Sequence, residues 1–357
     1  MGVVLPGMPA HLVEDHLDEL AQLAESAGAQ VVGRVVQARK SPDPSTFVGR
    51  GKAKEIGEEA RILGVDLLVF DDDLSGGQVK SLEEQTGILV MDRSGLILDI
   101  FDQRAQSREA RTQVELARLR YQLPRLTRRW SHLSRQAGGI GMRGGEGEKQ
   151  LEQDRRVLRV RIRGLEKELA KIERTRRLHR KGRRGVPTVA LTGYTNAGKS
   201  TLFNRLTDAG VLAEDRVFAT LDARLRRGSV NGNRAVVFAD TVGFIRKLPH
   251  HLVSSFRSTL GELLEADLVL HLVDRSHPQW REQMDVAEEV MAELGVDPAR
   301  VVTVFNKSDR VASSPGGEGS EGAGDRQGRW ISAKTGFGLA ALQDDIARRL
   351  GLSEAVE

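Results

Sequence analysis

One short segment constrains this chain more than any other. Residues 193–200 read Gly-Tyr-Thr-Asn-Ala-Gly-Lys-Ser, which matches the pattern G-x-x-x-x-G-K-[S/T] of a phosphate-binding loop. An apolar run at residues 186–191 precedes the segment and an expected helix at 200–206 follows it, as this motif requires. Glycines let backbone N–H groups converge on phosphates, and the helix N-terminus adds a positive dipole end. The segment therefore predicts an α/β domain in which Lys199 reaches the β- and γ-phosphates and Ser200 binds Mg²⁺.

Three further segments follow in the order that a guanine-nucleotide pocket needs. They are Asp-Thr-Val-Gly at residues 240–243, Asn-Lys-Ser-Asp at 306–309 and Ser-Ala-Lys at 332–334. A glycine-rich loop alone is also found as an ordinary strand-to-helix turn, so the first segment does not decide the matter by itself. The four segments in this order favour the pocket.

The third segment selects the base. The carboxylate of Asp309 can accept hydrogen bonds from the N1–H and the 2-amino group of guanine. Adenine offers no such pair, so a buried carboxylate would lose its partners, at roughly 1–3 kcal/mol or more. We expect Asn306 and Lys307 to brace the loop and pack along the base, and the backbone N–H of Ala333 to reach guanine O6.

The catalytic end of the pocket has one standard feature and two unusual ones. We expect the hydroxyl of Thr220 to meet Mg²⁺ only when the γ-phosphate is present, Asp240 to hold the Mg²⁺ shell through water, and Gly243 to offer its N–H to the γ-phosphate. Phe244 stands where many GTPases have a water-orienting glutamine, which predicts slow hydrolysis until a partner supplies the geometry. Asn196 either binds a monovalent cation such as K⁺ beside the phosphates or stabilises the loop turn; both interpretations stay open.

The expected site residues fall into three groups. The candidate catalytic residues are Lys199, Thr220 and Gly243. The candidate Mg²⁺ ligands are Ser200, Thr220 and Asp240, and the candidate K⁺ ligand is Asn196. The residues expected to line the GTP pocket are Gly193, Tyr194, Thr195, Asn196, Ala197, Gly198, Lys199, Ser200, Thr201, Asp240, Gly243, Asn306, Lys307, Asp309, Ser332, Ala333 and Lys334.

Charge is distributed unevenly along the 357 residues. The net charge of +4 divides into −9 for residues 1–102, +16 for 103–185 and −3 for 186–357. A concentration of positive charge in one segment is the electrostatic footprint of a nucleic-acid partner. The chain has no cysteine, which excludes disulfides and cysteine-based metal sites. No apolar stretch approaches the ~20 residues of a membrane span, and the N-terminus lacks a signal-peptide pattern, so we expect a cytoplasmic protein.

The sequence predicts three domains. Residues 1–103 alternate between helical and strand patterns, with helices expected at 11–27, 51–63 and 79–85 and strands at 30–36, 66–70 and 88–91, and this predicts a small α/β domain with a parallel sheet. Residues 186–357 form the GTPase domain, with a mixed, mostly parallel sheet flanked by helices. Three consecutive aspartates at 71–73 are interpreted as a solvated strand end in preference to a metal site.

Residues 104–185 are predicted to form a basic helical hairpin. Leucines at 116, 119, 123 and 126 and apolar residues at 158, 162, 165, 169 and 172 form two seams at helical spacing, which suits two antiparallel helices. Pro124 should kink or end the first helix. The glycine-rich residues 138–148 join the helices, either as a plain connector or as a functional tip.

The chain resembles the HflX family of ribosome-associated GTPases over nearly its whole length. The resemblance rests on Phe-Val-Gly-Arg-Gly-Lys at residues 47–52, Gln-Val-Glu-Leu-Ala at 113–117, Gly-Gly-Ile-Gly at 138–141 and, most specifically, Asp-Thr-Val-Gly-Phe-Ile-Arg-Lys-Leu-Pro at 240–249. The tip departs from the family pattern, because residues 143–148 lack the expected proline. No second phosphate loop supports the ATP binding linked to the family's N-terminal domain, and that question stays open.

The resemblance implies a GTP-dependent factor that binds the large ribosomal subunit and separates stalled 70S ribosomes into subunits under stress. We also expect a monomer. The hairpin tip would then reach ribosomal RNA near the peptidyl-transferase region. The alternatives are a GTP-gated RNA- or ribosome-binding regulator without splitting activity and an ATP-driven RNA remodelling factor that uses the N-terminal domain.

Overall fold

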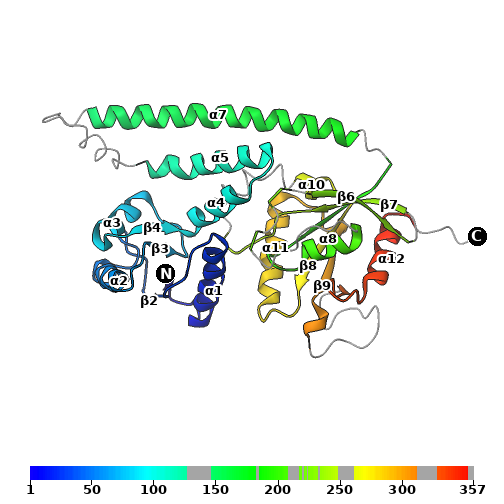
Figure 1. The fold of residues 1–357 in the computed structure, drawn as a ribbon, viewed down its shortest axis with the longest axis horizontal. Coiled ribbons are helices and arrows are strands. Elements are labelled where there is room, and N and C mark those ends of the chain that lie inside the picture. Colours follow the sequence, from blue (N-terminus) through cyan, green and yellow to red (C-terminus); the bar gives the residue numbers. More distant parts are fainter. Residues whose placement is uncertain are drawn as a thin grey trace, which may run out of the picture. The chain divides into compact units, whose positions relative to one another are not determined.

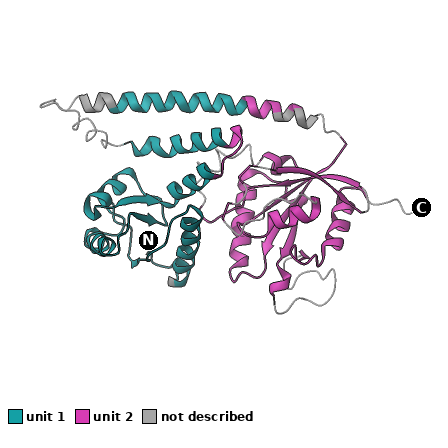
Figure 2. Ribbon diagram, in the orientation of Figure 1, with its two compact units in different colours: residues 1–103, 111–170 teal, residues 104–110, 171–357 magenta. Residues whose placement is uncertain are grey.

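The computed structural model describes residues 1–126, 146–181, 185–207, 217–218, 221–222, 224–231, 234–247, 261–311 and 328–352 (Figure 1). Contacts group the chain into two compact units. The first comprises residues 1–103 and 111–170, and the second comprises residues 104–110 and 171–357 (Figure 2). The three-domain division made from the sequence stays a prediction.

The second unit is built on a six-stranded sheet with the order β10-β9-β8-β5-β7-β6. The strands are β5 (Thr188–Gly193), β6 (Arg224–Val230), β7 (Arg234–Asp240), β8 (Leu268–Asp274), β9 (Val301–Asn306) and β10 (Arg329–Trp330). All neighbouring pairs are parallel except β6 with β7. This confirms the predicted fold class, an α/β domain with a mostly parallel sheet flanked by helices. β6 and β10 were not predicted from the sequence.

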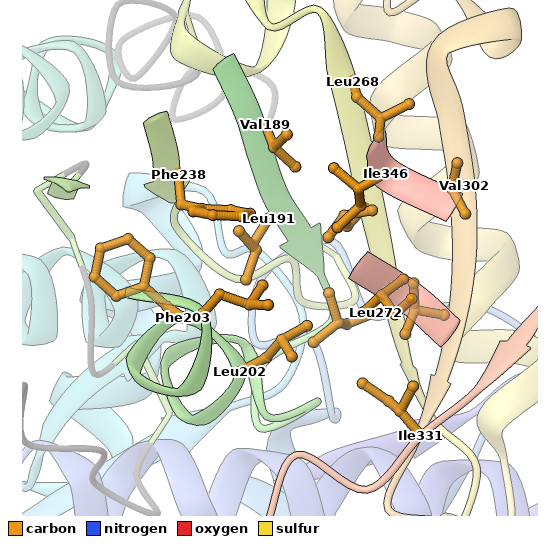
Figure 3. Close-up of a cluster of buried hydrophobic side chains, with 14 of the residues drawn as sticks. Val189, Leu191, Leu202, Phe203, Phe238, Leu268, Leu272, Val302, Ile331 and Ile346 are labelled. Atoms are coloured by element: carbon orange, nitrogen blue, oxygen red, sulfur yellow. The ribbon is translucent and has the colours of Figure 1, made fainter. Parts of the chain in front are cut away.

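Helices cover both faces of this sheet. On one face, α8 (Lys199–Thr207) and α12 (Leu339–Arg349) bury Leu202, Phe203 and Ile346 against Leu191 and Leu272 (Figure 3). On the other face, α10 (Gly261–Glu265) and α11 (Trp280–Leu294) pack against the alternate residues of the strands. Because successive strand residues point to opposite faces, a strand buried on both sides reads as a continuous apolar run. Residues 186–191 show this pattern.

The first unit begins with an α/β arrangement of short parallel strands. β1 (Gly2–Val4) pairs with β2 (Val36–Ala38), and β3 (Leu67–Phe70) pairs with β4 (Leu89–Asp92). The helices are α1 (Ala10–Ser26), α2 (Arg50–Ile62) and α3 (Gly76–Thr86). The strand predicted at 30–36 is therefore wrong: pairing begins only at Val36, and Val31 and Val32 are exposed.

The prediction of a solvated strand end at 71–73 is wrong for Asp71, whereas Asp73 is exposed. Asp71 is buried, and its carboxylate accepts a 2.7 Å hydrogen bond from the buried guanidinium of Arg93. Arg93 also pairs with Glu19 of α1, and Asp73 accepts from the hydroxyl of Ser94. Among the residues placed by the structure, no cluster of acidic and histidine side chains suits a metal ion. Asp71 and Asp73 therefore connect the end of β3 to the next helix, and Arg93 extends this connection to α1.

That next helix, α4 (Arg93–Arg104), was not predicted from the sequence. Its buried residues include Leu96, Ile97, Leu98, Ile100 and Phe101. Apolar residues on nearly every side leave only a weak helical periodicity, because one-sided burial is what produces the 3.6-residue pattern. The sequence signal was therefore absent for a physical reason.

The two long helices of the predicted hairpin are present. α5 spans Arg108–Gln122 and is followed by the single turn η1 (Leu123–Arg125), while α7 spans Glu146–Lys181. As predicted, α5 ends just before Pro124. The expected seam also forms, with Leu116 of α5 buried against Ile162 and Leu165 of α7. Most of the proposed tip, residues 138–145, lies outside the described residues.

Candidate nucleotide-binding site

The phosphate-binding loop leaves β5 at Gly193 and enters α8 at Lys199, as the motif predicts. Gly193 and Gly198 have φ angles of +139° and +93°, values that favour glycine. A Cβ at Gly193 would meet Leu272 O at 2.2 Å, and one at Gly198 would meet Asn306 Nδ2 at 2.2 Å. Both glycines are therefore required by backbone angle and by close approach of neighbouring groups.

Lys199 is buried, and its ammonium is held inside the loop. Nζ donates to the carbonyl oxygens of Gly193 at 3.1 Å and Tyr194 at 2.7 Å. Burial lowers the pKa of Lys199 to about 8, against an opposing effect of Asp240. A lysine placed in this way is ready to exchange carbonyl partners for phosphate oxygens, which would stabilise its charge.

The oxygen atoms predicted to bind Mg²⁺ lie together. Ser200 Oγ, at the start of α8, donates to Asp240 Oδ2, at the end of β7, over 2.9 Å. A hydroxyl and a carboxylate are hard oxygen ligands, and Mg²⁺ is commonly bound by one or two such groups together with water and substrate phosphates. The donor set therefore fits Mg²⁺. The third predicted ligand, Thr220, lies outside the described residues.

The segment after Asp240 forms backbone hydrogen bonds with the phosphate loop. Thr195 N donates to Phe244 O at 2.7 Å, and Phe244 N donates to Gly193 O at 3.0 Å. The Phe244 side chain is 1% exposed and belongs to the core beside α10 and α11, so it does not face the phosphates. A Cβ at Gly243 would meet Lys199 Nζ at 2.8 Å. This close approach places Gly243 beside the Lys199 ammonium, and its contact with the γ-phosphate stays a prediction.

A second contact joins the phosphate loop to the segment after Asp240, and it was not predicted from the sequence. Arg246 N donates to the hydroxyl of Tyr194 at 2.9 Å. The buried guanidinium of Arg246 binds Gln279 and lies 3.4 Å from Glu282 of α11. The motif gave Tyr194 only as a variable loop position, and no local pattern could have paired it with Arg246.

The base-binding segments are joined to the phosphate loop by Asn306. Its Nδ2 donates to Ala197 O at 2.8 Å, and its Oδ1 accepts from Ala333 N at 2.9 Å. The asparagine therefore braces the loop, as predicted. The N–H of Ala333, predicted to reach guanine O6, is used by Asn306 in this structure, so that contact requires the N–H to be shared or exchanged.

Asp309, which was predicted to select the base, is exposed, and a neighbouring hydroxyl orients its carboxylate. Asp309 Oδ1 accepts from Ser332 Oγ at 2.6 Å. Lys307 has a φ of 60° and places Nζ 2.7 Å from Asp274 Oδ2, at the end of β8. Arg205 of α8 donates to the carbonyl oxygen of Lys334 at 2.7 Å. The last two sequence segments are thus held together at one end of the sheet.

Two further predicted pocket residues are Asn196 and Thr201. Asn196 is exposed at a φ of 65°, a backbone conformation that asparagine tolerates better than most residues. The conformation is compatible with the loop-turn interpretation, and K⁺ binding stays a prediction. Thr201 is half-buried in the first turn of α8.

A parallel sheet that brings a phosphate loop, an Mg²⁺-type oxygen pair and an Asn-Lys-x-Asp segment to one end defines a P-loop GTPase. Three family models match the chain in succession. They are described as the GTP-binding GTPase N-terminal domain (residues 14–102), the GTP-binding GTPase middle region (residues 104–183) and the 50S ribosome-binding GTPase (residues 188–307). The chain belongs to the HflX family of GTPases.

Curated relatives named GTPase HflX carry this assignment. The relative from Lacrimispora saccharolytica is 50% identical over 91% of this chain and 77% of its own length. The relative from Escherichia coli K12 is 44% identical over 94% of this chain and 79% of its own length. The crystal structure of SsGBP in complex with GDP is similar in fold, with a TM-score of 0.51 and 24% identity over 99% of each chain. Of the helices that the structure describes, none has both the length and the apolar character of a membrane span.

Proposed function

We propose that this GTPase binds the large ribosomal subunit in the cytoplasm and uses GTP to dissociate stalled or stressed 70S ribosomes into subunits. The observation that carries the proposal is a line of exposed cations on α7. Its members recur at helical spacing on the side opposite the buried seam, and they are Arg156, Arg163, Lys167, Lys171 and Arg174. We call them the α7 basic stripe. Within the described ranges, none of the five forms an ion pair or other side-chain hydrogen bond.

An uncompensated line of cations on a rigid helix suits a phosphate backbone. Close to the seam, by contrast, basic residues are paired: Arg161 lies 2.7 Å from Glu115, and Arg120 lies 2.8 Å from Glu166. The basic residues therefore fall into two groups. Those near the seam are paired between α5 and α7, and those of the α7 basic stripe are available to a partner. Phosphate contacts supply affinity without sequence selectivity, and the family description supports a ribosomal partner.

For the reaction itself, we propose roles that follow from the site geometry. Lys199 neutralises the β- and γ-phosphates, Gly243 donates its N–H to the γ-phosphate, and Asp309 selects guanine. Ser200 and Asp240, with Thr220, would hold Mg²⁺, which supplies positive charge to the phosphates when it is bound. We also propose that the residues predicted from the sequence to line the GTP pocket do line it.

Buried Phe244 cannot orient the attacking water, so activation must come from elsewhere. We propose that the large subunit supplies this geometry and that K⁺ at Asn196 adds charge beside the phosphates. GTP hydrolysis should then rise strongly with large subunits and be faster in K⁺ than in Na⁺. The Asn196→Ala variant should lose only the K⁺ effect. Fast hydrolysis by the isolated chain, independent of both, would contradict the proposal.

The splitting activity is tested by replacing residues 138–148 with a short neutral linker. Sucrose gradients of 70S particles with GTP, GDP or a non-hydrolysable analogue measure splitting, and co-sedimentation measures binding. We expect the replaced chain to bind nucleotide normally and bind ribosomes in part, but not to split them. Splitting equal to that of the parent would make the loop a plain connector. Binding by the parent chain without splitting would indicate a GTP-gated regulator.

A further inference from the structure

A carboxylate of the GTPase unit binds the start of the first hairpin helix. Asp222 Oδ2 accepts hydrogen bonds from Gln106 N at 3.2 Å and Ser107 N at 3.1 Å, and Oδ1 accepts from the Ser107 hydroxyl. Residues 104–110 belong to the same compact unit as Asp222. These bonds link positions 115 and 116 residues apart in the sequence.

Capping α5 does not by itself require Asp222. Ser107 is already the cap, because its Oγ accepts from Ala110 N at 3.0 Å, which is the usual N-cap arrangement. The distant carboxylate adds negative charge at the helix N-terminus, where the helix dipole favours it. Its consequence is to fix two segments to each other, one that begins α5 and one that belongs to the GTPase sheet.

Asp222 lies at the phosphate end of that sheet. It precedes β6 by two residues, and Arg224, the first residue of β6, is paired in register with Asp240. Leu221 is 2% exposed, so the backbone beside Asp222 is anchored in the core. In the sequence, Asp222 also follows the predicted switch residue Thr220 by two positions. Asp222 therefore lies between the predicted switch residue and the strand that is paired with Asp240.

We infer that Asp222 is a positioning residue for the GTPase reaction: by binding the N-terminus of α5, it couples the GTP-bound arrangement of the pocket to the helical hairpin. Anchoring at α5 pre-organises the segment before β6 and so reduces the ordering required when GTP binds. GDP lacks the γ-phosphate and should depend less on the anchor. Coupling of this kind is reciprocal, so a partner that moves α5 would alter the affinity for GTP.

The test uses the full chain without ribosomes, so its outcome is independent of the proposed splitting activity. Hydrogen exchange at Gln106 and Ser107 reports the contact directly, and fluorescent nucleotide titrations give the ratio of GTP-analogue to GDP affinity. In Asp222→Ala we expect roughly tenfold faster exchange at these amides and a loss of about fivefold or more in the affinity ratio. Asp222→Asn keeps one carbonyl acceptor and should restore part of both.

The matched control is Asp297→Ala. Asp297 is an exposed carboxylate that caps the single turn η3 (Pro298–Arg300) by accepting from Ala299 N at 3.0 Å. It should leave the affinity ratio and the exchange at Gln106 and Ser107 unchanged. If Asp222→Ala matches this control in the affinity ratio, the contact is only a cap and the inference is wrong. Unchanged exchange at Gln106 and Ser107 in Asp222→Ala would also overturn it. Should that variant fail to fold, Asp222→Asn and Ser107→Ala supply the same comparison.

Discussion

At the scale of single residues, the pocket depends on side chains that hold one another in place before nucleotide arrives. Asp309 is oriented by the Ser332 hydroxyl, and Asn306 joins the phosphate loop to Ala333. The Asp309 carboxylate that the Ser332 hydroxyl orients is exposed in this structure. Under the proposed function, two donors of guanine would meet this carboxylate, and a base that lacks them would leave the charged acceptor without partners.

Exchanging Asp309 for asparagine should change the base that is bound. The Asp309→Asn amide donates where guanine also donates, so GTP binding should weaken by roughly 1–3 kcal/mol, while xanthine nucleotides should gain affinity. Competition among GTP, XTP and ATP measures the change. An unaltered preference for GTP would remove Asp309 from base recognition.

A pH dependence should follow from the buried Lys199. Its pKa of about 8 means that the ammonium loses its proton as the pH rises through 8. Bound phosphates favour the charged form and raise this pKa, so binding takes up a proton above about pH 8, and GTP affinity should fall as the pH rises through that value. Titration calorimetry at pH 8.5 in buffers with different ionisation enthalpies measures the uptake. Lys199→Arg, whose side chain stays charged, should show none.

At the scale of elements, the α5–α7 seam is held chiefly by a few buried apolar side chains. Leu116 and Leu165 are nearly inaccessible, and Ile162 packs between the same helices. The remaining residues of α7 are mostly exposed. A helix pair with so narrow an apolar seam depends strongly on each of its members.

Truncating the seam should loosen the hairpin. Leu165→Ala removes a side chain that is 3% exposed and should lower the opening free energy of α5 and α7 by about 2–5 kcal/mol. Hydrogen exchange of the amides in both helices measures this. The control is Val160→Ala. The Val160 side chain is 55% exposed, so this variant should change the opening free energy by no more than about 0.5 kcal/mol. Equal effects of the two variants would show that the seam does not stabilise the pair.

At the scale of the whole molecule, the charge distribution matters more than the total. A net +16 within residues 103–185 is offset by acidic residues elsewhere, which leaves +4 overall. The positive segment includes the α7 basic stripe. A polyanionic partner would therefore be bound through one part of the chain, and this binding should depend strongly on ionic strength.

Neutralising part of the α7 basic stripe should reduce that dependence. Replacing Arg163, Lys167 and Lys171 with glutamine removes three possible phosphate contacts, so the slope of log K against log salt should fall by roughly two to three units. Co-sedimentation with large subunits at several salt concentrations measures the slope. Arg161→Gln removes a cation already paired with Glu115 and should have a smaller effect. If both changes have the same effect, the stripe is not the binding face.

The sequence by itself determined the GTPase class, the central strands and the phosphate loop between β5 and α8, because these depend on local backbone requirements and on fixed spacings. Gly193 and Gly198 have positive φ angles, Lys199 begins α8 and Asp240 ends β7, each at the position that its motif fixes. The seam of the hairpin was also predictable, since burial on one side imposes a helical period.

Only the tertiary structure decided the contacts between residues far apart in the chain. The valine-rich stretch before Val36 looked like a strand but lacks a partner along most of its length, and α4 was hidden because it is buried on nearly every side. The pairing of Tyr194 with Arg246, and of Asp222 with Ser107, has no local signature. Hydrogen bonds of this kind depend on how elements pack, and a one-dimensional pattern records only which face of each element is buried.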